Sequence, residues 1–459
     1  MKRIIVVGAG ISGLSLAFEL ERLGAAVLVL ESERRSGGKI ETDRRDGYIC
    51  ERGPASILDR QNSIAPLARS LGIEARILPA FAAGERRLVV ADGRLHDTPL
   101  DALAFFRSRL LPLPAKLRML VDLLLLRGPS ARGQEESVTA FAGRRLGRLA
   151  GERLLEPLVS GLYAGDPDLV SLPAAFPLMA ALERKHRSLV MGMRADLKQQ
   201  RAKRQAGGDA ARLSSFVTGL DELTTALASR LGEHLRLGAR VAQVERVTSG
   251  YRLVVDRDGL SSTLDADAVV LAIPAHQACQ VVRLLDADLS GVLAGIPYVP
   301  VALVHLGYFA SALPDPPAAY GFFVPASERL KILGAIFPSA IFSGRAPDRF
   351  SLVSVRTGGA RHPEMTTLPD DELTALAHAD LRGLLGLTAP PAFVHVVRHE
   401  RALPQYTLGH MQRVAALEAA ERRYPGLYFH GGAYHNAGVP ELVSRSGKLA
   451  SRLLEELSG

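Results

Sequence analysis

The first residues with a chemical use are three glycines, Gly8, Gly10 and Gly13, which follow a short apolar run and precede a helix-like stretch. Gly8 allows a tight turn, Gly10 leaves no side chain between the backbone and a pyrophosphate, and Gly13 lets the helix approach a sheet. The helix amino terminus then offers free N–H groups to phosphate oxygens. A second apolar run ends in Glu31, whose carboxylate can accept hydrogen bonds from a ribose. The pattern predicts a site for a dinucleotide.

The elements that must position these groups are two strands and the helix between them. Residues 2–7 and 25–30 are apolar runs typical of strands, and the stretch that ends near Leu23 has the character of a helix. A basic start before an apolar run also suits a secretory signal, but Glu19 and Glu21 would fall inside its apolar part. We therefore expect a βαβ unit that begins at residue 2, without a cleaved leader or transit peptide.

The composition is that of a globular protein. The chain has 459 residues, of which 47% are hydrophobic and 23% charged, enough for two or three domains with their own cores. No apolar run approaches the ~18–20 residues that span a bilayer. The net charge of +8 suits an anionic partner such as a carboxylate-bearing substrate or an acidic membrane surface. We expect no nucleic-acid partner, because no binding motif is recognised and aromatic residues are few.

The cysteines and histidines argue against a metal centre. Cys50 and Cys279 lie far apart without metal-ligand spacing, and the twelve histidines form no HExxH-like cluster. This usage predicts a reducing compartment, the cytoplasm, with no disulfide framework and no zinc or iron–sulfur site.

Beyond the first unit, the chain alternates between helical and strand-rich segments. A short strand is predicted at 87–91, and helical periodicity dominates from residue 101 to about 204. Strand patterns return at 239–273 and 296–360. A helix at 370–385, strands at 392–398 and 427–430, and a helix at 444–457 close the chain. Glycine turns at both ends, a helical insert and a β-rich middle predict an α/β fold, α+β overall.

Two glycine segments together resemble a known cofactor signature. The first glycine turn, continued through Leu30-Glu31, Arg35-x-Gly37-Gly38-Lys39 and Thr42, resembles the FAD-binding signature of flavin amine oxidases and porphyrinogen oxidases. Pro425-Gly426-Leu427-Tyr428-Phe429-x-Gly431, with Gly438-Val439 and Ser446-Gly447, resembles the second flavin segment. The resemblance implies noncovalent FAD, since no cysteine lies near the carboxyl terminus.

The middle of the chain narrows the resemblance. The chain is similar over nearly its whole length to oxygen-dependent protoporphyrinogen and coproporphyrinogen oxidases. The segments that carry it are Glu51-Arg52-Gly53-Pro54-x-Ser56, Leu158-x-Ser160-Gly161-x-Tyr163-Ala164-Gly165-Asp166, His186-Arg187-Ser188-Leu189-x-x-Gly192 and Pro404-Gln405-Tyr406-x-x-Gly409-His410.

This resemblance implies three domains and a set of cofactor contacts. The domains are a Rossmann-type FAD domain of the amine-oxidase and p-hydroxybenzoate-hydroxylase kind (1–57, 212–280 and 402–459), a β-rich substrate domain (58–85 and 281–401) and a helical membrane-associating domain (86–211). The implied cofactor contacts are Gly8, Ala9, Gly10, Ile11, Ser12, Gly13, Glu31, Ser32, Arg35, Gly38, Lys39, Gly53, Pro54, Ala55, Ser56, Val241, His399, Gly432, Ala437, Gly438 and Val439. At position 55 relatives often carry Asn or Asp, and at position 399 some carry Trp.

The implied reaction is the six-electron oxidation of protoporphyrinogen IX to protoporphyrin IX in haem biosynthesis. A methylene bridge gives hydride to the flavin, three times in all, and oxygen reoxidises the flavin to give H2O2. Because the flavin does the chemistry, we expect no catalytic side chain. Ferrochelatase, which follows in the pathway, is a further candidate partner.

The implied substrate contacts are Arg87, Gly161, Tyr320, Phe322, Phe323 and Arg356. Arg87 would bind a propionate bidentately, whereas the alternative is that Arg86 and Arg87 are two solvated charges beside a turn. The Gly161 carbonyl would face the macrocycle nitrogens, and the three aromatic side chains would lie against the ring or in the sheet core. Arg356 would bind a further propionate, which favours coproporphyrinogen III, or point outward from its strand.

The segment 101–132 alternates apolar residues with Arg107, Arg109, Lys116, Arg118 and Arg127. This pattern suits a helix lying on the cytoplasmic face of a membrane; the alternative is a helical layer packed on its neighbours.

Three other functions stay open. A flavin amine oxidase commonly has Trp beside the flavin, whereas this chain has none. A carotenoid desaturase shares the first glycine signature but not the Tyr163–Asp166 segment. A flavin-fold porphyrin carrier without enzyme activity is the third.

Overall fold

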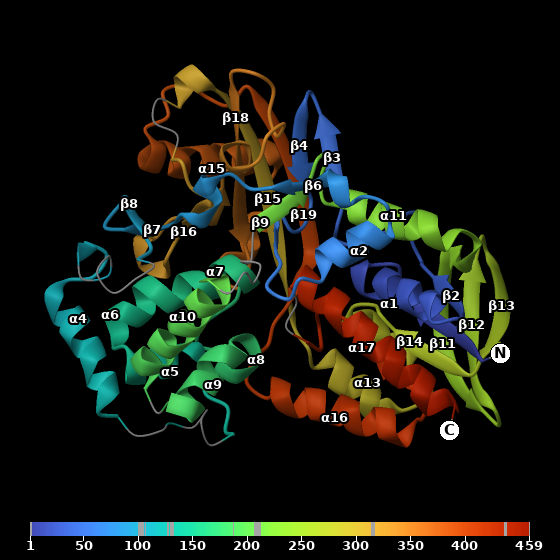
Figure 1. Cartoon of the computed structure of the whole chain (residues 1–459). Coiled ribbons are helices and arrows are strands. Elements are labelled where there is room, and N and C mark those ends of the chain that lie inside the picture. Colours follow the sequence, from blue (N-terminus) through green and yellow to red (C-terminus); the bar gives the residue numbers. More distant parts are fainter. Residues whose placement is uncertain are drawn as a thin grey trace.

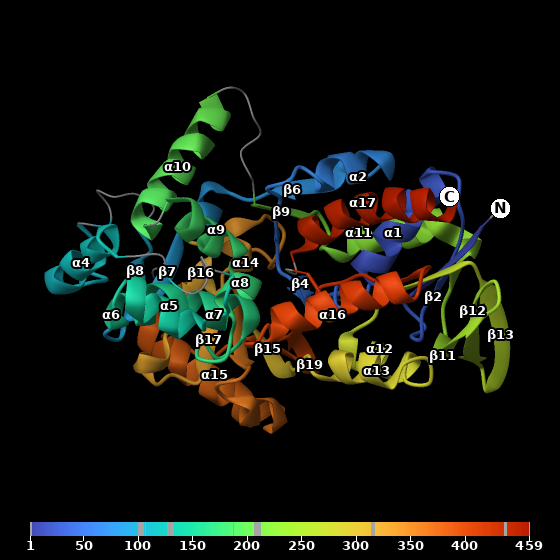
Figure 2. The ribbon, with the colours of Figure 1, turned by 90° about the horizontal axis from the view of Figure 1, so that it is seen from below.

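The computed structural model describes residues 2–99, 105, 107–125, 128, 133–186, 188–205, 213–313, 317–435 and 438–458. The amino-terminal βαβ unit and the closing helix lie side by side at one end of the molecule (Figure 1). The helices of residues 113–205 form a separate lobe at the other end, and a large twisted sheet lies between and above the two. Figure 2 shows the same arrangement from below.

The first layer is a five-stranded parallel sheet. Its three central strands are fully or nearly fully buried apolar runs, as expected for a parallel sheet that is covered on both faces. One face packs on α1 (Ile11–Arg22), α11 (Asp221–Leu231) and α17 (Val439–Ser458). In spatial order the strands are β10 (Leu235–Arg236), β2 (Ala26–Leu30), β1 (Arg3–Val7), β14 (Ala268–Leu271) and β20 (Leu427–Phe429).

An antiparallel sheet and a group of helices cover the other face of the parallel sheet. The three antiparallel strands are β11 (Ala239–Val247), β12 (Gly250–Arg257) and β13 (Leu260–Ala266). The helices are α12 (Ala275–Val281), α13 (Ala287–Ala294) and α16 (His410–Arg423). The dinucleotide-binding signature therefore lies in a layered α/β unit.

The second layer is a seven-stranded sheet. Its spatial order is β19 (Phe393–Pro404), β15 (Tyr298–Phe309), β18 (Phe350–Gly358), β17 (Ile332–Ile336), β16 (Gly321–Phe323), β7 (Arg87–Ala91) and β8 (Arg94–Asp97). One face packs on α15 (Asp370–Leu385) through a core that includes Val304, Phe322 and Val355. The opposite face turns toward the first layer and the helical lobe, and we call it the site face. Because side chains alternate along each strand, the register assigns every residue to one of these faces.

The register aligns one row of residues across the site face. Val397 pairs with Leu303, Leu303 with Arg356, Arg356 with Gly334, and Gly334 with Phe323. The row thus brings together residues from five strands. Two of them, Arg356 and Phe323, are among the expected substrate contacts.

The helical lobe is held together by buried ion pairs. The Arg145 side chain has no exposed surface, lies 2.9 Å from Asp122 and also contacts Glu183. Replacing one of these side chains by an apolar one would leave an unpaired buried charge. The ion pairs therefore stabilise the packing of these helices. The helical segments are α4 (Leu113–Leu120), η3 (Val121–Leu123), α5 (Val138–Arg145), α6 (Arg148–Ala150), η5 (Gly151–Leu155), α7 (Glu156–Tyr163), α8 (Leu172–Ala175), α9 (Pro177–His186) and α10 (Leu189–Gln205). Within the described ranges, no helix combines the length and apolarity needed to cross a membrane.

Small elements connect these layers. They are the hairpin β3 (Thr42–Arg45) and β4 (Tyr48–Glu51), the strands β5 (Ile57–Leu58), β9 (Leu213–Phe216) and β6 (Ile77–Pro79), and the helices α2 (Ile64–Ser70) and α14 (Pro338–Ile341). Short 3₁₀ turns occur at η1 (Glu74–Arg76), η2 (Ala82–Glu85), η6 (Gly232–His234), η7 (Ala310–Ala312), η8 (Ala326–Glu328) and η9 (Pro363–Thr367).

The expected α/β architecture, α+β overall, is confirmed, with differences at element ends. Strand 87–91 and helix 370–385 have the expected bounds, whereas the closing helix starts five residues earlier, at Val439, and strand 393–404 is longer than expected. The boundary placed at residue 86 needs correction. Strands β7 and β8 pair into the seven-stranded sheet because Leu88 and Val90 pack in its core, so residues 87–97 lie with the sheet and not with the helices. The division into three domains stays a proposal.

Candidate cofactor and substrate site

The glycine turn between β1 and α1 has the shape of a phosphate cradle. Gly8 has φ +104°, and a Cβ at Gly13 would lie 1.9 Å from the Gly8 carbonyl oxygen, so both positions need glycine. A Cβ at Gly10, in contrast, would meet no heavy atom within 4 Å. Helix α1 starts without a side-chain cap, so its first N–H groups, including those near Ile11 and Ser12, stay available. Open space in front of an uncapped helix end fits a pyrophosphate.

Glu31 is held where the ribose of such a ligand would lie. Its Oε2 accepts a hydrogen bond of 2.7 Å from the Ala9 N–H. Its Oε1 accepts from the Ser32 hydroxyl at 3.1 Å and from the Glu33 N–H at 3.0 Å. A carboxylate has about four acceptor positions, so one remains for a ribose hydroxyl.

The second glycine pair packs directly on the first turn. The Gly37 N–H donates to the Ala9 carbonyl at 2.8 Å, and a Cβ at Gly38 would lie 3.2 Å from Gly10 Cα. Arg35 donates to the Gly38 carbonyl at 2.9 Å. The structure therefore brings these predicted contacts to one edge of the cradle.

Lys39 lies beside the same cradle but points toward the large sheet. Its ammonium donates to the backbone carbonyls of Arg401, at 2.9 Å, and Ala402. Burial lowers the pKa of Lys39 to about 8. Lys39 thus ties the cradle to β19.

The carboxyl-terminal segment completes the cradle from the other side. The Gly432 carbonyl accepts a hydrogen bond from the buried Tyr406 hydroxyl. His430 and Ser15 each lie 2.8 Å from the Ser446 hydroxyl, which joins α1 to α17. Gly438 and Val439 open α17, and Val241 lies buried on β11 beside β2, whereas Ala437 is outside the described residues.

A loop from Arg52 to Ser56 joins the cradle to the site face. A Cβ at Gly53 would lie 2.0 Å from the Lys39 carbonyl oxygen, so the loop packs tightly there. The His399 Nε2 lies 2.6 Å from the Arg52 carbonyl oxygen, and the Ser56 hydroxyl lies 3.2 Å from that of Tyr320. Pro54 and Ala55 lie between these two contacts and are partly exposed.

Arg356 lies deep on the site face. It donates a hydrogen bond to the Gly161 backbone carbonyl at the end of α7. Burial lowers its pKa, yet part of the residue's surface remains exposed. A Cβ at Gly161 would lie 2.1 Å from the Phe323 ring, so glycine is needed there. The Arg356 side chain therefore points toward α7 and not outward into solvent.

Arg87 differs from its neighbour Arg86. Arg86 forms an ion pair with Asp97 beside the turn, at 2.5 Å. Arg87 is half-buried, with its guanidinium 5.4 Å from the centre of the Tyr320 ring, and it pairs with no acidic side chain among the described residues. Arg86 is thus a surface charge, as the alternative interpretation expects, whereas Arg87 is not.

Phe322 requires a correction. It is 2% exposed and packs in the core against α15, because neighbouring residues of a strand point to opposite faces. We therefore remove Phe322 from the substrate contacts. Tyr320 and Phe323 stay, since they contact Arg87 and Gly161 on the site side.

Sequence reasoning missed Arg361. It donates to Glu156 at 2.8 Å and to the Ser160 hydroxyl at 2.9 Å, which fixes α7 on the large sheet one residue before Gly161. Arg361 lies 205 residues after Glu156 in the sequence. No local sequence pattern could therefore have indicated this contact.

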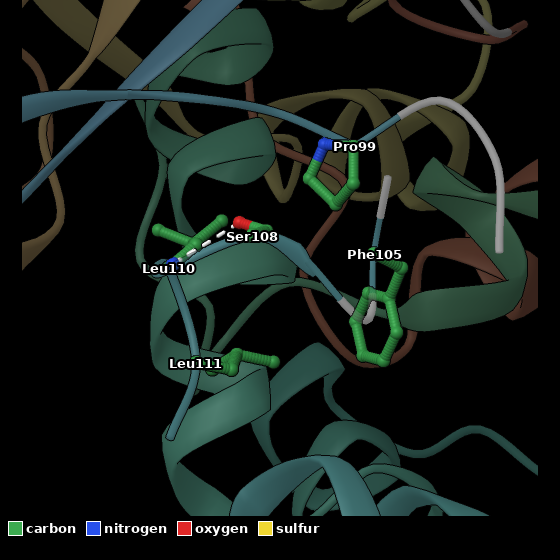
Figure 3. A pocket seen from close by; sticks show the side chains of 5 residues that line it. All are labelled: Pro99, Phe105, Ser108, Leu110 and Leu111. Atoms are coloured by element: carbon green, nitrogen blue, oxygen red, sulfur yellow. Dashed lines mark hydrogen bonds between the residues drawn. The ribbon is translucent and has the colours of Figure 1, made fainter. Parts of the chain in front are cut away.

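A separate small pocket lies in the segment that leads from β8 to the helical lobe (Figure 3). The figure shows apolar side chains and the hydroxyl of Ser108, which accepts from the Leu110 N–H at 3.1 Å. Its lining residues are Pro99, Phe105, Ser108, Leu110 and Leu111. None of them is an acid, a base or a strong nucleophile, so we assign the pocket no chemistry.

The chain is similar to known flavoproteins over its whole length. The family model "Flavin containing amine oxidoreductase" matches residues 11–454. Coproporphyrinogen III oxidase of Bacillus subtilis is 30% identical, over 98% of this chain and 97% of that protein. Chloroplastic protoporphyrinogen oxidase of Nicotiana tabacum is also 30% identical, over 99% of this chain and 86% of that protein.

Solved structures agree with these matches. A candidate protoporphyrinogen oxidase from Exiguobacterium superposes with a TM-score of 0.82 at 28% identity, covering 100% of this chain and 99% of that one. A putrescine oxidase variant superposes with a TM-score of 0.69 at 17% identity, covering 99% of each chain, which shows a shared fold only.

Proposed function

This chain belongs to the protoporphyrinogen and coproporphyrinogen oxidase family of flavin-containing amine oxidoreductases, and on that premise we propose that it oxidises protoporphyrinogen IX to protoporphyrin IX. The proposed enzyme uses noncovalent FAD and molecular oxygen, and it releases H2O2 as a step of haem biosynthesis. Six electrons leave the substrate in three two-electron rounds.

The residues of the cradle fit FAD. The open space at Gly10, the uncapped end of α1 and the acceptor position left on Glu31 suit a pyrophosphate and a ribose. Both cysteines, Cys50 and Cys279, are buried, and neither belongs to the carboxyl-terminal glycine segment, which supports noncovalent binding. When bound, the flavin ring supplies the hydride acceptor. The chain's own contribution is to orient the macrocycle and to hold the loop from Arg52 to Ser56 against it.

The choice of substrate depends on which of two arginines, Arg87 and Arg356, has a guanidinium without a hydrogen-bond partner among the described residues. Arg356 already donates to the Gly161 carbonyl, whereas Arg87 donates no hydrogen bond to any described residue. Arg87 is therefore the guanidinium available to a propionate, and a guanidinium binds a carboxylate bidentately. One available cation suits the substrate with two carboxylates better than the one with four.

Coproporphyrinogen III is the second candidate substrate. Its specific support is that Arg356 lies on the site face with part of its surface exposed, where we propose that it meets a further propionate. The relatives do not decide, because a coproporphyrinogen oxidase and a protoporphyrinogen oxidase are equally similar to this chain, at 30% identity each.

We also propose peripheral contact with the cytoplasmic face of a membrane. Leu113, Leu117 and Leu124 are 63%, 53% and 78% exposed on α4 and just after η3. Of the cations expected to rim this surface, Lys116 and Arg118 instead donate to backbone carbonyls of the lobe. The proposed contact therefore depends on apolar burial more than on charge. Part of the segment 101–132, including Arg127, is outside the described residues, and ferrochelatase stays a proposed partner for the product.

Anaerobic mixing tests the proposed activity. Addition of protoporphyrinogen should bleach the flavin absorbance, and admission of oxygen should restore it with the appearance of porphyrin fluorescence. Putrescine and aromatic amines should leave the flavin oxidised. Bleaching by amines but not by porphyrinogens would replace this proposal by an amine oxidase.

A further inference from the structure

His399 has one nitrogen engaged and one free. Its Nε2 lies 2.6 Å from the Arg52 carbonyl oxygen. A carbonyl only accepts, so Nε2 carries the hydrogen and Nδ1 carries the lone pair. Nδ1 has no hydrogen-bond partner among the described residues and is not one of their buried unpartnered atoms, so it reaches open space. The imidazole is thus fixed in the tautomer that presents a base.

His399 also lies on the site face. It pairs with Val301 on β15, and Val301 pairs with Gly358 on β18, two residues beyond Arg356. The loop from Arg52, which His399 contacts, to Ser56, which contacts Tyr320, contains four peptide steps and spans at most about 14 Å. His399 and the proposed substrate contacts therefore border the same space.

The surroundings keep His399 neutral. Burial lowers its pKa, and the nearby charges of Lys39 and Arg52 act in the same direction. Its hydrogen bond to the Arg52 carbonyl and the charge of Glu41 oppose this shift without reversing it. A neutral imidazole with a free lone pair can accept a proton at physiological pH.

The other described histidines on this face, His305 and His395, are more buried than His399. His305 is 2% exposed; its Nδ1 bonds Ser354 and its Nε2 is enclosed without a partner. His395 bonds Asp43 at 2.6 Å through Nε2 and is 9% exposed.

We propose that His399 is the proton acceptor of the site, taking at Nδ1 the proton that leaves the substrate in each oxidation round. The proposal rests on the proposed function, since it requires a porphyrinogen as substrate. Hydride removal from a methylene bridge leaves a cation shared with the neighbouring pyrrole nitrogen. Transfer of the N–H proton to Nδ1 leaves the electron pair of that bond on the ring, which forms the new double bond.

The atoms and electrons balance in each round. The substrate loses one hydride from a methylene bridge, to the flavin, and one proton, to His399. Over the three rounds, two of these protons leave pyrrole N–H groups and the third leaves the fourth methylene bridge. Oxygen takes the two electrons, and the two hydrogens end in H2O2, which returns His399 to its neutral form. One histidine therefore serves all three rounds.

The test uses the flavin-loaded enzyme and two substitutions. His399→Gln keeps an N–H donor for the Arg52 carbonyl but removes the base, and His378→Gln is the control, because His378 bonds Tyr308 from α15. Flavin reduction by porphyrinogen should slow about 10²-fold in His399→Gln, the usual weight of a general base. The control should react as the wild type does.

The pH profile separates a base from a structural residue. The wild-type rate should fall at acid pH, with an apparent pKa below the ordinary histidine value of about 6.5, and His399→Gln should lack this limb. Added imidazole should partly restore the rate of His399→Ala. ¹⁵N NMR of the wild type should show the Nε2–H tautomer, a readout independent of turnover.

Normal reduction rates and an unchanged acid limb in His399→Gln would overturn this role alone, as would the Nδ1–H tautomer. Failure of the wild type to oxidise either porphyrinogen would overturn the proposed function, and the role of His399 with it.

Discussion

The Arg356 guanidinium donates a hydrogen bond to the Gly161 backbone carbonyl, across 195 residues of sequence. This bond joins β18 of the large sheet to the last turn of α7 in the helical lobe. It fixes the direction of a carbonyl that faces the proposed macrocycle site, and it engages a cation that the sequence alone leaves free. In the proposed function, the preference between the two porphyrinogens depends on whether Arg356 stays on this carbonyl or moves to a carboxylate.

Arg87→Ala should weaken turnover of protoporphyrinogen. A charge-assisted hydrogen bond in a partly screened cavity contributes about 1.5–3 kcal/mol, so kcat/KM should fall about ten- to a hundredfold, mainly through KM. Steady-state kinetics measure this, and the flavin spectrum should stay unchanged. Arg86→Ala is the matched control, since Arg86 pairs with Asp97 at the surface and should cost little. Equal losses in both variants would contradict the role of Arg87.

Arg356→Met tests the number of carboxylates bound. Methionine keeps the unbranched apolar stem of the side chain and removes the guanidinium with its charge. If protoporphyrinogen is the preferred substrate, kcat/KM should change by less than the loss in Arg87→Ala, because Arg356 serves the Gly161 carbonyl. A loss that rivals Arg87→Ala, together with faster wild-type turnover of coproporphyrinogen, would make coproporphyrinogen III the substrate.

Gly10→Val should abolish flavin binding and leave the fold intact. A Cβ at Gly10 meets no protein atom within 4 Å, so the new side chain fills only the space that we assign to the pyrophosphate. The purified variant should be colourless, with wild-type circular dichroism. Gly143→Ala, which also meets no atom within 4 Å but lies on α5, should stay yellow. Wild-type flavin content in Gly10→Val would remove the main support for the cradle.

The structural features that could be predicted from the sequence are those determined by residues close together in the chain. The turn from Gly8 to Gly13 and the helix 370–385 depend on neighbours within a few residues, and both are as expected. The contacts of Arg356 and Arg361 join segments far apart in the chain, so sequence alone left Arg356 between two readings. Phe322 was misassigned because strand parity, not residue type, decides which face a side chain occupies.

Glu51 should make stability depend on pH. It is buried, accepts from the Thr42 hydroxyl at 2.7 Å and from the Leu220 N–H at 2.9 Å, and burial raises its pKa to about 7. Its folded pKa lies above the unfolded value, so its contribution to stability is fully present below about pH 4.5 and is lost as pH rises through about 7. The loss is about 3 kcal/mol.

Denaturant titrations at several pH values measure the Glu51 contribution. Glu51→Gln keeps an acceptor for Leu220 and should flatten the pH dependence between these values. It should also be more stable than the wild type near pH 8. An unchanged pH dependence in Glu51→Gln would assign the effect to other groups.

Leu124→Glu should weaken the proposed membrane contact. Leu124 is 78% exposed, so a charge there costs the fold little but opposes insertion of the apolar surface. Flotation with anionic liposomes measures binding. Leu260→Glu is the control, because Leu260 is 75% exposed on β13 at the other end of the molecule. Equal flotation of both variants and the wild type would leave the helices of this lobe as a packing layer only.

The central claim is that this flavoprotein oxidises a porphyrinogen with oxygen. The most direct measurement is aerobic turnover of the purified protein with protoporphyrinogen IX and coproporphyrinogen III in parallel, following porphyrin fluorescence and oxygen uptake. We predict porphyrin formation with three molecules of oxygen consumed per porphyrin, faster with protoporphyrinogen. No porphyrin above the uncatalysed rate from either substrate, with the flavin still oxidised after anaerobic mixing, would contradict the account.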